Sequence, residues 1–442
     1  MNNFLFEQEI RDFILKEKGY FVGATADASF VSLLRNLLHK QLNLDASRFF
    51  LQVPNPSALE KSLRDALEEG FRPLLLLDRL FRGQDMTTAA RTLKRDFPDI
   101  RLLLLTTYMD KEQIIYLYEL GVDSFIVKPV SAQTVLEKLA FALNPLGRIG
   151  EVVETAKNLL REGKPEEAKA AAEQILRIKP GSAVGLMALG DAERLLGHSQ
   201  AARRAYRQAC DNSPLFLEPM QKMALLAEEN GNLEECLAWL DKMDSLSPLN
   251  PDRKVNMGAI NLNLGNEAKA DRLFQQAMEQ ARNLKEHIGS LAERIATLYA
   301  ETDPEKSETF LRRALEAKKT RLTRDDIHIY NHLGISLRRQ GKWEEAIEEY
   351  RRALDLAPDD AGLHYNMGMA FAQGNKMMEA RRSMEAALRH NERFAYTSAD
   401  VAYNMGAVLL KGAGKELAGR CFAAALEQDP SLDKAREALR LL

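Results

Sequence analysis

This chain of 442 residues has few cysteines, no long apolar run and no large excess of positive or negative charge. Its three cysteines, Cys210, Cys236 and Cys421, are scattered and odd in number, which indicates a reducing compartment rather than a disulfide framework or metal cluster. No apolar run approaches the roughly 20 residues that a bilayer requires. Glu7 and Glu9 interrupt the apolar start, so no secretory signal is expected. Lys and Arg (61) nearly balance Asp and Glu (64), which gives no basic surface for nucleic acid. We therefore expect a soluble, cytoplasmic protein that neither binds nucleic acid nor inserts into a membrane.

Short apolar runs followed by polar residues recur in the first third of the chain. Three of them lead into Asp78, Thr106 and Lys128, and the first two are runs of four leucines. Because such runs alternate with amphipathic stretches, they predict a doubly wound parallel α/β sheet. The carboxyl ends of parallel strands share one edge, so a carboxylate, a hydroxyl and an ammonium are expected to meet there.

The expected elements can be placed by residue number. Strands are expected at 20–24, 49–53, 73–78, 101–106 and 124–127, and helices near 29–41, 57–68, 87–95, 111–120 and 131–143. A further amphipathic helix from about Glu7 to Lys18 is expected to cover an exposed face of this domain.

The stretch from Gly121 to Pro129 resembles the fifth-strand signature of two-component receiver domains, and the resemblance covers about residues 19–143. It implies a flavodoxin-like fold. It also implies that a histidine kinase or phosphotransfer protein is a partner of this domain. The receiver-like domain can in addition form a homodimer.

The resemblance also implies roles for single residues. Asp78 matches the phosphoacceptor, Thr106 the hydroxyl that turns toward a phosphoryl group, Lys128 the ammonium that contacts it, and Phe125 the aromatic switch residue. An aspartyl phosphate adds nearly two negative charges, which a hydroxyl and an ammonium can satisfy.

The acidic pair with which receivers hold Mg²⁺ is missing after the first strand. Thr25-Ala26-Asp27 stands there, so Asp27 lies one place beyond the usual pair and forms with Asp78 at most a weak Mg²⁺ site. No cofactor is therefore expected to be required. Arg79 and Arg82 follow Asp78 and are expected to neutralise part of its charge. These departures favour a pseudo-receiver that serves as a docking or dimerisation surface.

The remaining two thirds repeat with a period of 34 residues, as the spacing of Ala168, Ala202, Cys236 and Ala270 shows. The clearest copy runs from Tyr330 to Pro358, and the pattern resembles the tetratricopeptide repeat, a pair of antiparallel helices. The resemblance implies an all-α superhelix. Eight repeats are expected, beginning near Ile149, Ala183, Leu217, Pro251, Lys285, Ile327, Ala361 and Ala399, with a capping helix from Asp433 to Leu442.

Small residues recur at equivalent places in these repeats. Gly190, Gly258, Gly334, Gly368 and Gly406 are expected to let helix backbones approach one another. The fifth repeat is the expected exception: Ile295 and Ser307 are assigned to its small-residue places, which predicts a distorted joint. The whole chain is divided into an N-terminal extension (1–18), a receiver-like domain (19–143), a linker (144–148) and the array (149–442). So short a linker predicts close docking.

The first helix of each repeat is expected to line a concave surface that binds a protein partner. The candidate residues are Asn256, Asn331, His332, Arg338, Arg339, Tyr365, Asn366, Met369, Tyr403, Asn404 and Lys411. An amide both donates and accepts, so a ladder of asparagines can bracket the backbone of an extended peptide, while the cations can meet acidic groups. His332 is solitary, which argues against a metal site, and Cys236 is assigned to packing.

Two functions fit these features. One is a signalling adaptor in which the receiver-like domain regulates or positions the protein-binding array, as in a phosphorelay response regulator without DNA-binding output. The alternative is a phosphorylation-independent scaffold or chaperone that uses a pseudo-receiver for assembly. No nucleophile–base pair, phosphate loop or metal-ligand spacing predicts an enzyme.

Overall fold

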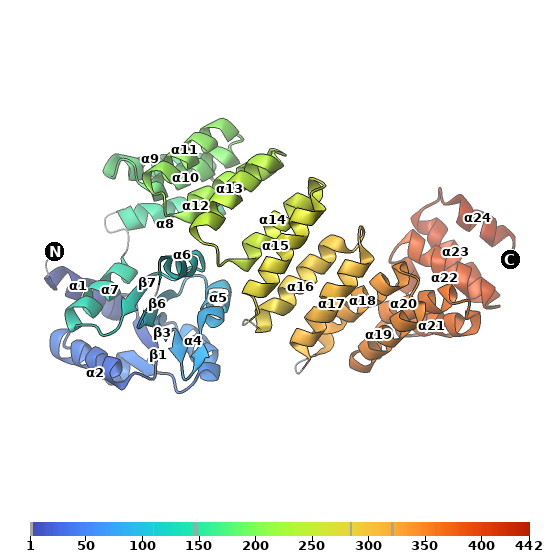
Figure 1. The fold of residues 1–442 in the computed structure, drawn as a ribbon, viewed down its shortest axis with the longest axis horizontal. Coiled ribbons are helices and arrows are strands. Elements are labelled where there is room, and N and C mark those ends of the chain that lie inside the picture. Colours follow the sequence, from blue (N-terminus) through green and yellow to red (C-terminus); the bar gives the residue numbers. More distant parts are fainter. Residues whose placement is uncertain (1–2, 109, 145–148, 283–284, 320–321) are drawn as a thin grey trace. The chain divides into compact units, whose positions relative to one another are not determined.

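The computed structural model describes residues 3–108, 110–144, 149–282, 285–319 and 322–442 (Figure 1). Two compact units make up the chain, Met1–Arg253 and Lys254–Leu442. The first holds an α/β domain and three helical pairs, and the second holds the later pairs. Most of the predicted linker, residues 145–148, lies outside the described residues, so the predicted division at 144–148 stays a prediction.

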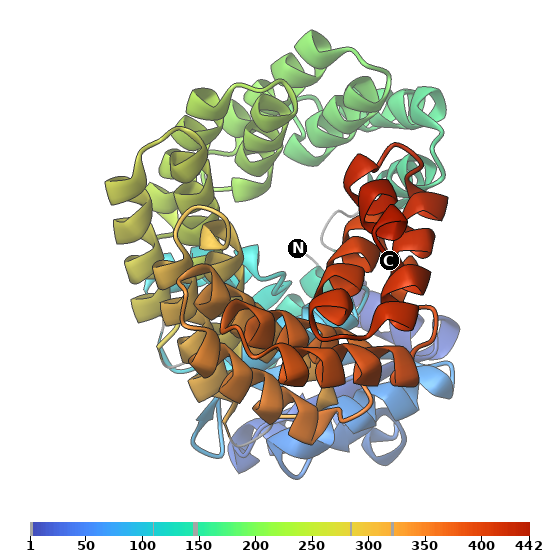
Figure 2. The same ribbon diagram turned by 90° about the vertical axis from the view of Figure 1, so that its right-hand side faces the viewer.

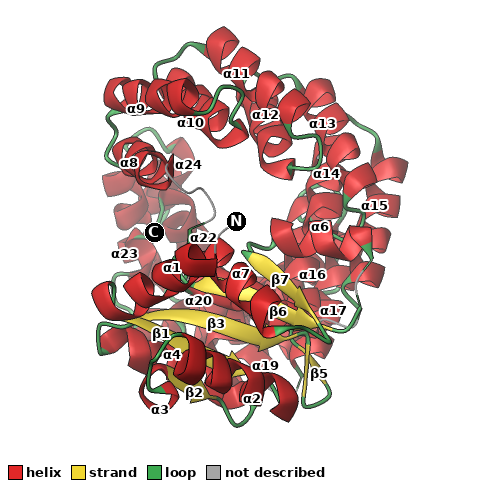
Figure 3. Cartoon of the chain, turned by 90° about the vertical axis from the view of Figure 1, so that its left-hand side faces the viewer, coloured by secondary structure: helices red, strands yellow, loops and turns green. Residues whose placement is uncertain are grey.

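The α/β domain is built on one parallel sheet (Figure 3). Its strands are β1 (Gly19–Ala24), β2 (Phe50–Gln52), β3 (Arg72–Asp78), β6 (Arg101–Thr106) and β7 (Ser124–Val127). They lie in the order β2-β1-β3-β6-β7, and every neighbouring pair is parallel. This order confirms the predicted doubly wound sheet and brings the carboxyl ends of β1, β3 and β7 to one edge.

Helices cover both faces of the sheet. One face carries α1 (Asn3–Lys16), α2 (Ala28–Asn36), continued by a π-helical turn (Leu37–Gln41), and α7 (Ala132–Leu143); the other carries α4 (Leu59–Glu68), α5 (Thr87–Asp96) and α6 (Lys111–Glu119). The four-leucine run in β3 serves both faces, because Leu74 and Leu76 pack on one side and Leu75 and Leu77 on the other. A strand buried on both faces must be apolar at every position.

The predicted N-terminal helix is present as α1 and begins a few residues earlier than expected. Ile10, Phe13 and Ile14 are buried against the sheet domain, whereas Phe4 is 68% exposed. Short elements were not predicted: helix α3 (Ala46–Phe49), 3₁₀ turns such as Pro56–Ala58, and the hairpin of β4 (Leu80–Phe81) and β5 (Gln84–Asp85) directly after Asp78.

The array consists of antiparallel helical pairs. The first unit contains α8 (Gly150–Arg161), α9 (Pro165–Ile178), α10 (Ala183–Leu195), α11 (Ser199–Asn212), α12 (Leu217–Glu229) and α13 (Leu233–Leu246). Next come α14 (Pro251–Asn263), which begins in the first unit, α15 (Glu267–Gln280), α16 (Lys285–Tyr299), α17 (Pro304–Lys318), α18 (Ile327–Arg339), α19 (Trp343–Leu356), α20 (Ala361–Gln373), α21 (Met377–His390), α22 (Ala399–Lys411), α23 (Lys415–Gln428) and α24 (Asp433–Arg440). In Figure 2 the orange to red helices, which form the pairs from α18 to α23, follow one another. Each first helix begins within one residue of its predicted position.

The helix glycines make room mainly for side chains, which corrects the expectation that they let backbones meet. A Cβ at Gly190, Gly258, Gly334 or Gly406 would lie 2.3–2.6 Å from a ring atom of Tyr206, Phe274, Tyr350 or Phe422, respectively. These rings come from the second helix of the same pair. At Gly368 the nearest atom is Met384 Cε at 3.0 Å, and the carbonyl oxygen of Ala380 lies 3.2 Å away.

The fifth repeat is a complete helical pair, and the assignment of Ile295 to its small-residue place was wrong. The small-residue place belongs to Ala292, which is the eighth residue of α16. Gly258 and Gly334 are likewise the eighth residues of α14 and α18. Ile295 is buried in the core, and Ser307 does occupy the small-residue place of α17. Longer connections on either side of α17, together with helices α16 and α17 of 15 residues each, account for the irregular spacing, rather than a poor core.

Candidate functional site

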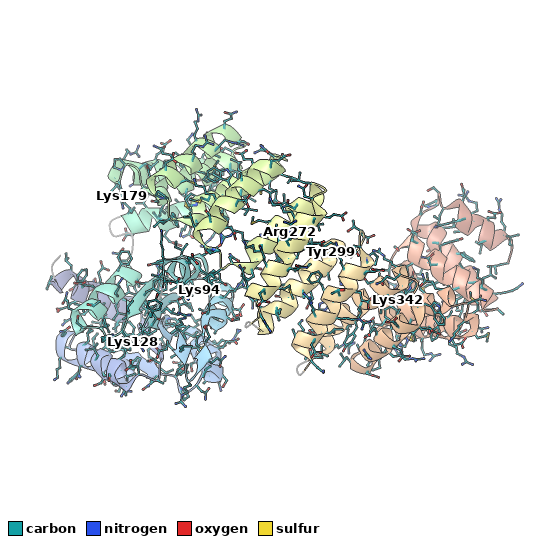
Figure 4. All side chains as sticks on the ribbon, in the orientation of Figure 1. Lys94, Lys128, Lys179, Arg272, Tyr299 and Lys342 are labelled. Carbon is teal, nitrogen blue, oxygen red and sulfur yellow. The ribbon has the colours of Figure 1, made fainter. Side chains whose placement is uncertain are left out.

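The carboxylate of Asp78 is held by two donors at the edge of the sheet. Asp78 ends β3, and Lys128 follows β7 (labelled in Figure 4); Lys128 Nζ donates to Asp78 Oδ1 at 2.7 Å. The hydroxyl of Thr25, directly after β1, donates to Asp78 Oδ2. Asp78 is 6% exposed. The structure thus brings Asp78 and Lys128 together as the sequence predicted, and it adds Thr25, at a position where the sequence indicated only that a metal ligand is missing.

Asp27 reaches the same ammonium from the start of α2. Its Oδ1 caps the helix by accepting from the backbone N–H groups of Ser29 and Phe30, both at 3.0 Å, and its Oδ2 lies 3.1 Å from Lys128 Nζ. The hydrogen bond from Phe30 is the largest cause that lowers the pKa of Asp27, and burial opposes it; Lys128 lowers the pKa further. Burial lowers the pKa of Lys128, but its hydrogen bonds to Asp78 and Asp27 outweigh burial and leave that pKa raised.

The ammonium of Lys128 therefore lies where a divalent cation would have to meet both carboxylates. Mg²⁺ demands several oxygen ligands in near-octahedral geometry. Asp27 has one oxygen committed to its helix cap, and its other oxygen, like Asp78 Oδ1, contacts Lys128. Within the described ranges no group of three His, Cys, Asp or Glu residues could hold a metal ion. This donor set does not fit Mg²⁺ while Lys128 is in place.

The Thr106 hydroxyl and the Phe125 ring have other partners than the Asp78 carboxylate, which accepts from Thr25 and Lys128. The Thr106 hydroxyl donates to the backbone oxygen of Tyr108 at 2.9 Å. Phe125 is 7% exposed, and its ring meets that of Tyr118 edge-to-face, with centroids 4.8 Å apart. Tyr118 itself is half exposed on α6.

Neither arginine of the following hairpin neutralises Asp78, so that prediction was wrong. Arg79 Nη1 donates to Gln113 Oε1 on α6 at 2.9 Å, and Arg82 is exposed at the hairpin turn with φ of 50°. Arg82 helps to line a cleft of about 650 Å³ with Thr25, Ala26, Gln52, Val53 and Pro54. The sheet register explains the outcome: Ala24 pairs with Leu77, so the next residue of each strand, Thr25 and Asp78, are neighbours.

The asparagines predicted to form a ladder bridge successive first helices of the second unit. Asn366 Nδ2 donates to Asn331 Oδ1 at 2.8 Å, which links α20 to α18. Asn404 Nδ2 donates to the Tyr365 hydroxyl at 3.4 Å, which links α22 to α20. Asn256 on α14 is exposed and accepts from Arg294 of α16 at 2.8 Å.

The aromatic and cationic candidates are partly engaged. Tyr365 packs on Phe394 and Tyr403 on Phe422, with centroids 5.6 and 5.8 Å apart, and Lys434 Nζ lies 4.4 Å from the Tyr403 ring. Met369 is half-buried and Lys411 exposed.

Two further candidates turn toward neighbouring repeats. Arg338 donates to Gln373 at 3.0 Å, and Arg339 pairs with the exposed Glu301 at 2.7 Å.

The prediction that His332 is solitary was wrong. Its ring meets that of His328, one turn earlier, with centroids 6.4 Å apart. Burial, followed by the charge of His328, lowers the pKa of His332.

Comparisons with known proteins match both parts of the chain. Tetratricopeptide repeat family models match residues 153–215 and 334–374. Response regulator protein VraR of Staphylococcus saprophyticus is 33% identical over 87 residues, 19% of this chain and 42% of that protein. VraR of Staphylococcus aureus strain Mu3 is 33% identical over 64 residues, 14% of this chain and 31% of that protein. The chain thus spans less than half the length of these relatives.

Two solved structures are also similar to this chain. The C-terminal part of a TPR repeat-containing protein from Cytophaga hutchinsonii is 13% identical, with a TM-score of 0.40, over 65% of this chain and 99% of that one. PilF of Pseudomonas aeruginosa is 15% identical, with a TM-score of 0.37, over 51% and 97%. No helix in the described part of this chain is long and apolar enough to cross a membrane.

Proposed function

Because the chain joins a domain similar to the receivers of response regulators to a tetratricopeptide array, we propose that it is a signalling adaptor. The array captures a protein partner, and the receiver-like domain regulates or positions the array. The observation that carries the proposal is the retained acceptor geometry: Asp78 stands buried at the end of β3 with the Lys128 ammonium 2.7 Å away. A histidine kinase or phosphotransfer protein is the corresponding source of the input.

The partner that fits the second unit best is an extended peptide with acidic side chains. The hydrogen bond between Asn366 and Asn331 uses one N–H of Asn366 and the side-chain oxygen of Asn331. The N–H groups of Asn331 and the side-chain oxygen of Asn366 therefore remain as a neighbouring donor and acceptor for a peptide group. Tyr365 and Tyr403 supply contact area, and the exposed Lys411 supplies positive charge.

Peptide capture is tested with the full chain as bait. Partners retained from a cell lysate are identified by mass spectrometry, and the affinity of the captured segment is measured by calorimetry. Asn366→Ala combined with Asn404→Ala should weaken binding by roughly 5- to 150-fold, the equivalent of about 1–3 kcal/mol for lost buried hydrogen bonds. Arg382→Ala, an exposed change on the second helix α21, is the matched control. Unchanged binding in the double variant would exclude this surface as the binding site. Loss of binding when Phe125 is changed would instead assign the contact to the receiver-like domain.

Phosphoryl input is tested with acetyl phosphate. A carboxylate oxygen of Asp78 attacks phosphorus, the bond from phosphorus to the acetyl oxygen breaks, and acetate leaves. We expect slow labelling with little dependence on Mg²⁺, because the Lys128 ammonium lies between the two carboxylates that a metal ion would have to contact. Thr25→Asp adds a third carboxylate and should make labelling faster and Mg²⁺-dependent. Intact-mass measurement with and without EDTA decides, with Asp78→Ala as control; rapid, EDTA-sensitive labelling of the natural chain would contradict the expectation.

A phosphorylation-independent scaffold is the second candidate, and the Thr25 hydroxyl favours it. This hydroxyl donates to Asp78 from the place where receivers carry a metal-binding carboxylate. For a scaffold, partner affinity is the same in the natural chain and in Asp78→Asn, with or without acetyl phosphate. For an adaptor, the phosphoryl donor changes the affinity of the natural chain only. Homodimerisation through the receiver-like domain, measured by light scattering, is compatible with either.

A further inference from the structure

The last residue of α6, Glu119, is hydrogen-bonded to the segment between α13 and α14 and to the first turn of α14, all within the first unit. Arg253 Nη2 donates to Glu119 Oε1 at 2.8 Å and to Oε2 at 2.7 Å. Asn250 Nδ2 donates to Oε1 at 2.6 Å, and Ser247 Oγ donates to Oε2 at 3.1 Å. We call these four residues the Glu119 clamp. Its donors are 128 to 134 residues away from Glu119 in sequence, so only tertiary structure brings them together.

The clamp is enclosed. The side chain of Arg253 is 2% exposed and that of Glu119 15%, and Ser247 is fully buried. Arg253 Nε and Nη1 have no hydrogen-bond partner among the described groups, so the hydrogen bonds of this guanidinium go to Glu119. Removing the partner of a buried charge costs far more free energy than removing the partner of a charge in a surface ion pair.

Neighbouring residues extend the contact along α5 and α6. Arg91 of α5 forms an ion pair with Asp252, next to Arg253. Tyr116, one turn before Glu119, is 8% exposed, and burial raises its pKa to about 12. Residues 247–253 therefore cover a desolvated surface formed by α5 and α6.

The same helix contacts the surroundings of Asp78. Arg79, the residue after Asp78, donates to Gln113 near the start of α6. Tyr118, adjacent to Glu119, packs on Phe125 of β7. One helix of nine residues thus connects the acceptor site at its start to the clamp at its end.

From these contacts we infer that the Glu119 clamp is an internal docking surface: α5 and α6 bind residues 247–253 of the same chain, and α6 makes that segment respond to changes at the Asp78 site. The docking stands on the contacts alone. The response to Asp78 rests on the proposed adaptor function.

Amide hydrogen exchange of the full chain, followed by mass spectrometry of peptides that cover residues 247–253, tests both parts. Glu119→Gln keeps the shape but removes the charge, and exchange there should rise by about 10-fold, as for a local opening that loses a charge-assisted hydrogen bond. Glu112→Gln, an exposed change on the same helix, should leave exchange unchanged. Arg79→Ala should raise exchange at 247–253 by a smaller factor.

Each result decides one part. Unchanged exchange in Glu119→Gln overturns the clamp, and unchanged exchange in Arg79→Ala overturns its coupling to Asp78. Arg253→Lys keeps the charge but loses the bidentate geometry, which guards against a general loss of structure. A rise confined to residues 247–253 in this variant supports the clamp, whereas a uniform rise across the chain overturns it as a local device. Failure of the Asn366 and Asn404 changes to affect peptide capture refutes the proposed binding surface and leaves these exchange results untouched.

Discussion

Alanine at Gly334 should destabilise the second unit, whereas alanine at Gly289 should stabilise it. Both glycines lie inside first helices, α18 and α16, with ordinary helical backbone. At Gly334 the new Cβ would lie 2.4 Å from two ring atoms of Tyr350, which is fully buried. At Gly289 the nearest atoms are Lys318 Cε at 3.5 Å and Ala317 Cβ at 3.7 Å, an ordinary van der Waals contact.

The magnitudes follow from two opposing effects. Replacing a helical glycine with alanine gains about 0.5–1 kcal/mol by restricting the unfolded backbone, and overpacking a filled core costs about 1–3 kcal/mol. Gly334→Ala should therefore lose about 1–2 kcal/mol net, whereas Gly289→Ala keeps the gain. For a unit of this size, 1 kcal/mol corresponds to about 2–4 °C in Tm. The expected changes are a decrease of about 2–8 °C for Gly334→Ala and an increase of about 1–4 °C for Gly289→Ala.

Circular dichroism melting, with hydrogen exchange of peptides from α18 and α19 to localise the effect, measures both variants. Tyr350→Leu supplies the internal control, because a smaller side chain should relieve the clash. Added to Tyr350→Leu, Gly334→Ala should then cost less than it does alone. The same sign of change at both glycines, or a full penalty at Gly334 without the ring, would refute the argument that the ring requires the glycine.

Three further predictions concern charge and thiols. Lys128→Met should lower the free energy of unfolding by about 3–5 kcal/mol, because it leaves the side chain of Asp78, which is 8% exposed, without its ammonium partner. Adding Asp78→Asn to this variant should recover most of the loss, as measured by urea unfolding. Folding lowers the pKa of Asp27 below its ordinary value of 3.8. The contribution of Asp27 to stability is therefore complete above pH 3.8 and disappears as the pH falls through the lower pKa of the folded state. Asp27→Asn should make the free energy of unfolding depend less on pH in this acidic range, as measured by urea unfolding. Burial raises the pKa of Cys236 and Cys421 to about 11, so iodoacetamide at pH 8 should alkylate these two thiols only after unfolding, as read by intact mass.

Elements that depend on local pattern were predictable from the sequence. The leucine runs gave β3 and β6 because a strand buried on both faces has little choice of composition. The 34-residue period gave the starts of the helical pairs, since each pair must place a small residue at the same contact; Ala270 and Ala346 are both the fourth residue of their helix. The assignment of Ile295 was wrong because it placed the insertion before this position, whereas the 34-residue spacing from Gly258 leads to Ala292 and the extra residues follow it.

Hydrogen-bond partners were much less predictable. Arg79 immediately follows Asp78 in sequence, yet its guanidinium reaches Gln113, because successive strand residues point to opposite faces and the hairpin turns the chain away. Thr25 is 53 residues from Asp78 and becomes its partner through the parallel register of β1 and β3. Charge and proximity in sequence favour the arginine, but the sheet register selects the threonine.

The displacement of one acidic residue by a single place accounts for most of the acceptor site. Asp27 begins α2, so one carboxylate oxygen is used in the helix cap and the other attracts Lys128. Lys128 then bridges Asp27 and Asp78, and the second oxygen of Asp78 is left to the Thr25 hydroxyl. Two carboxylates share one ammonium, which leaves an excess of one negative charge, and conversion of the Asp78 carboxylate to an aspartyl phosphate would raise this excess to nearly two. The arrangement that stabilises unmodified Asp78 therefore slows its phosphorylation, and a phosphoryl group becomes stable there when Lys128 leaves Asp27 to contact it.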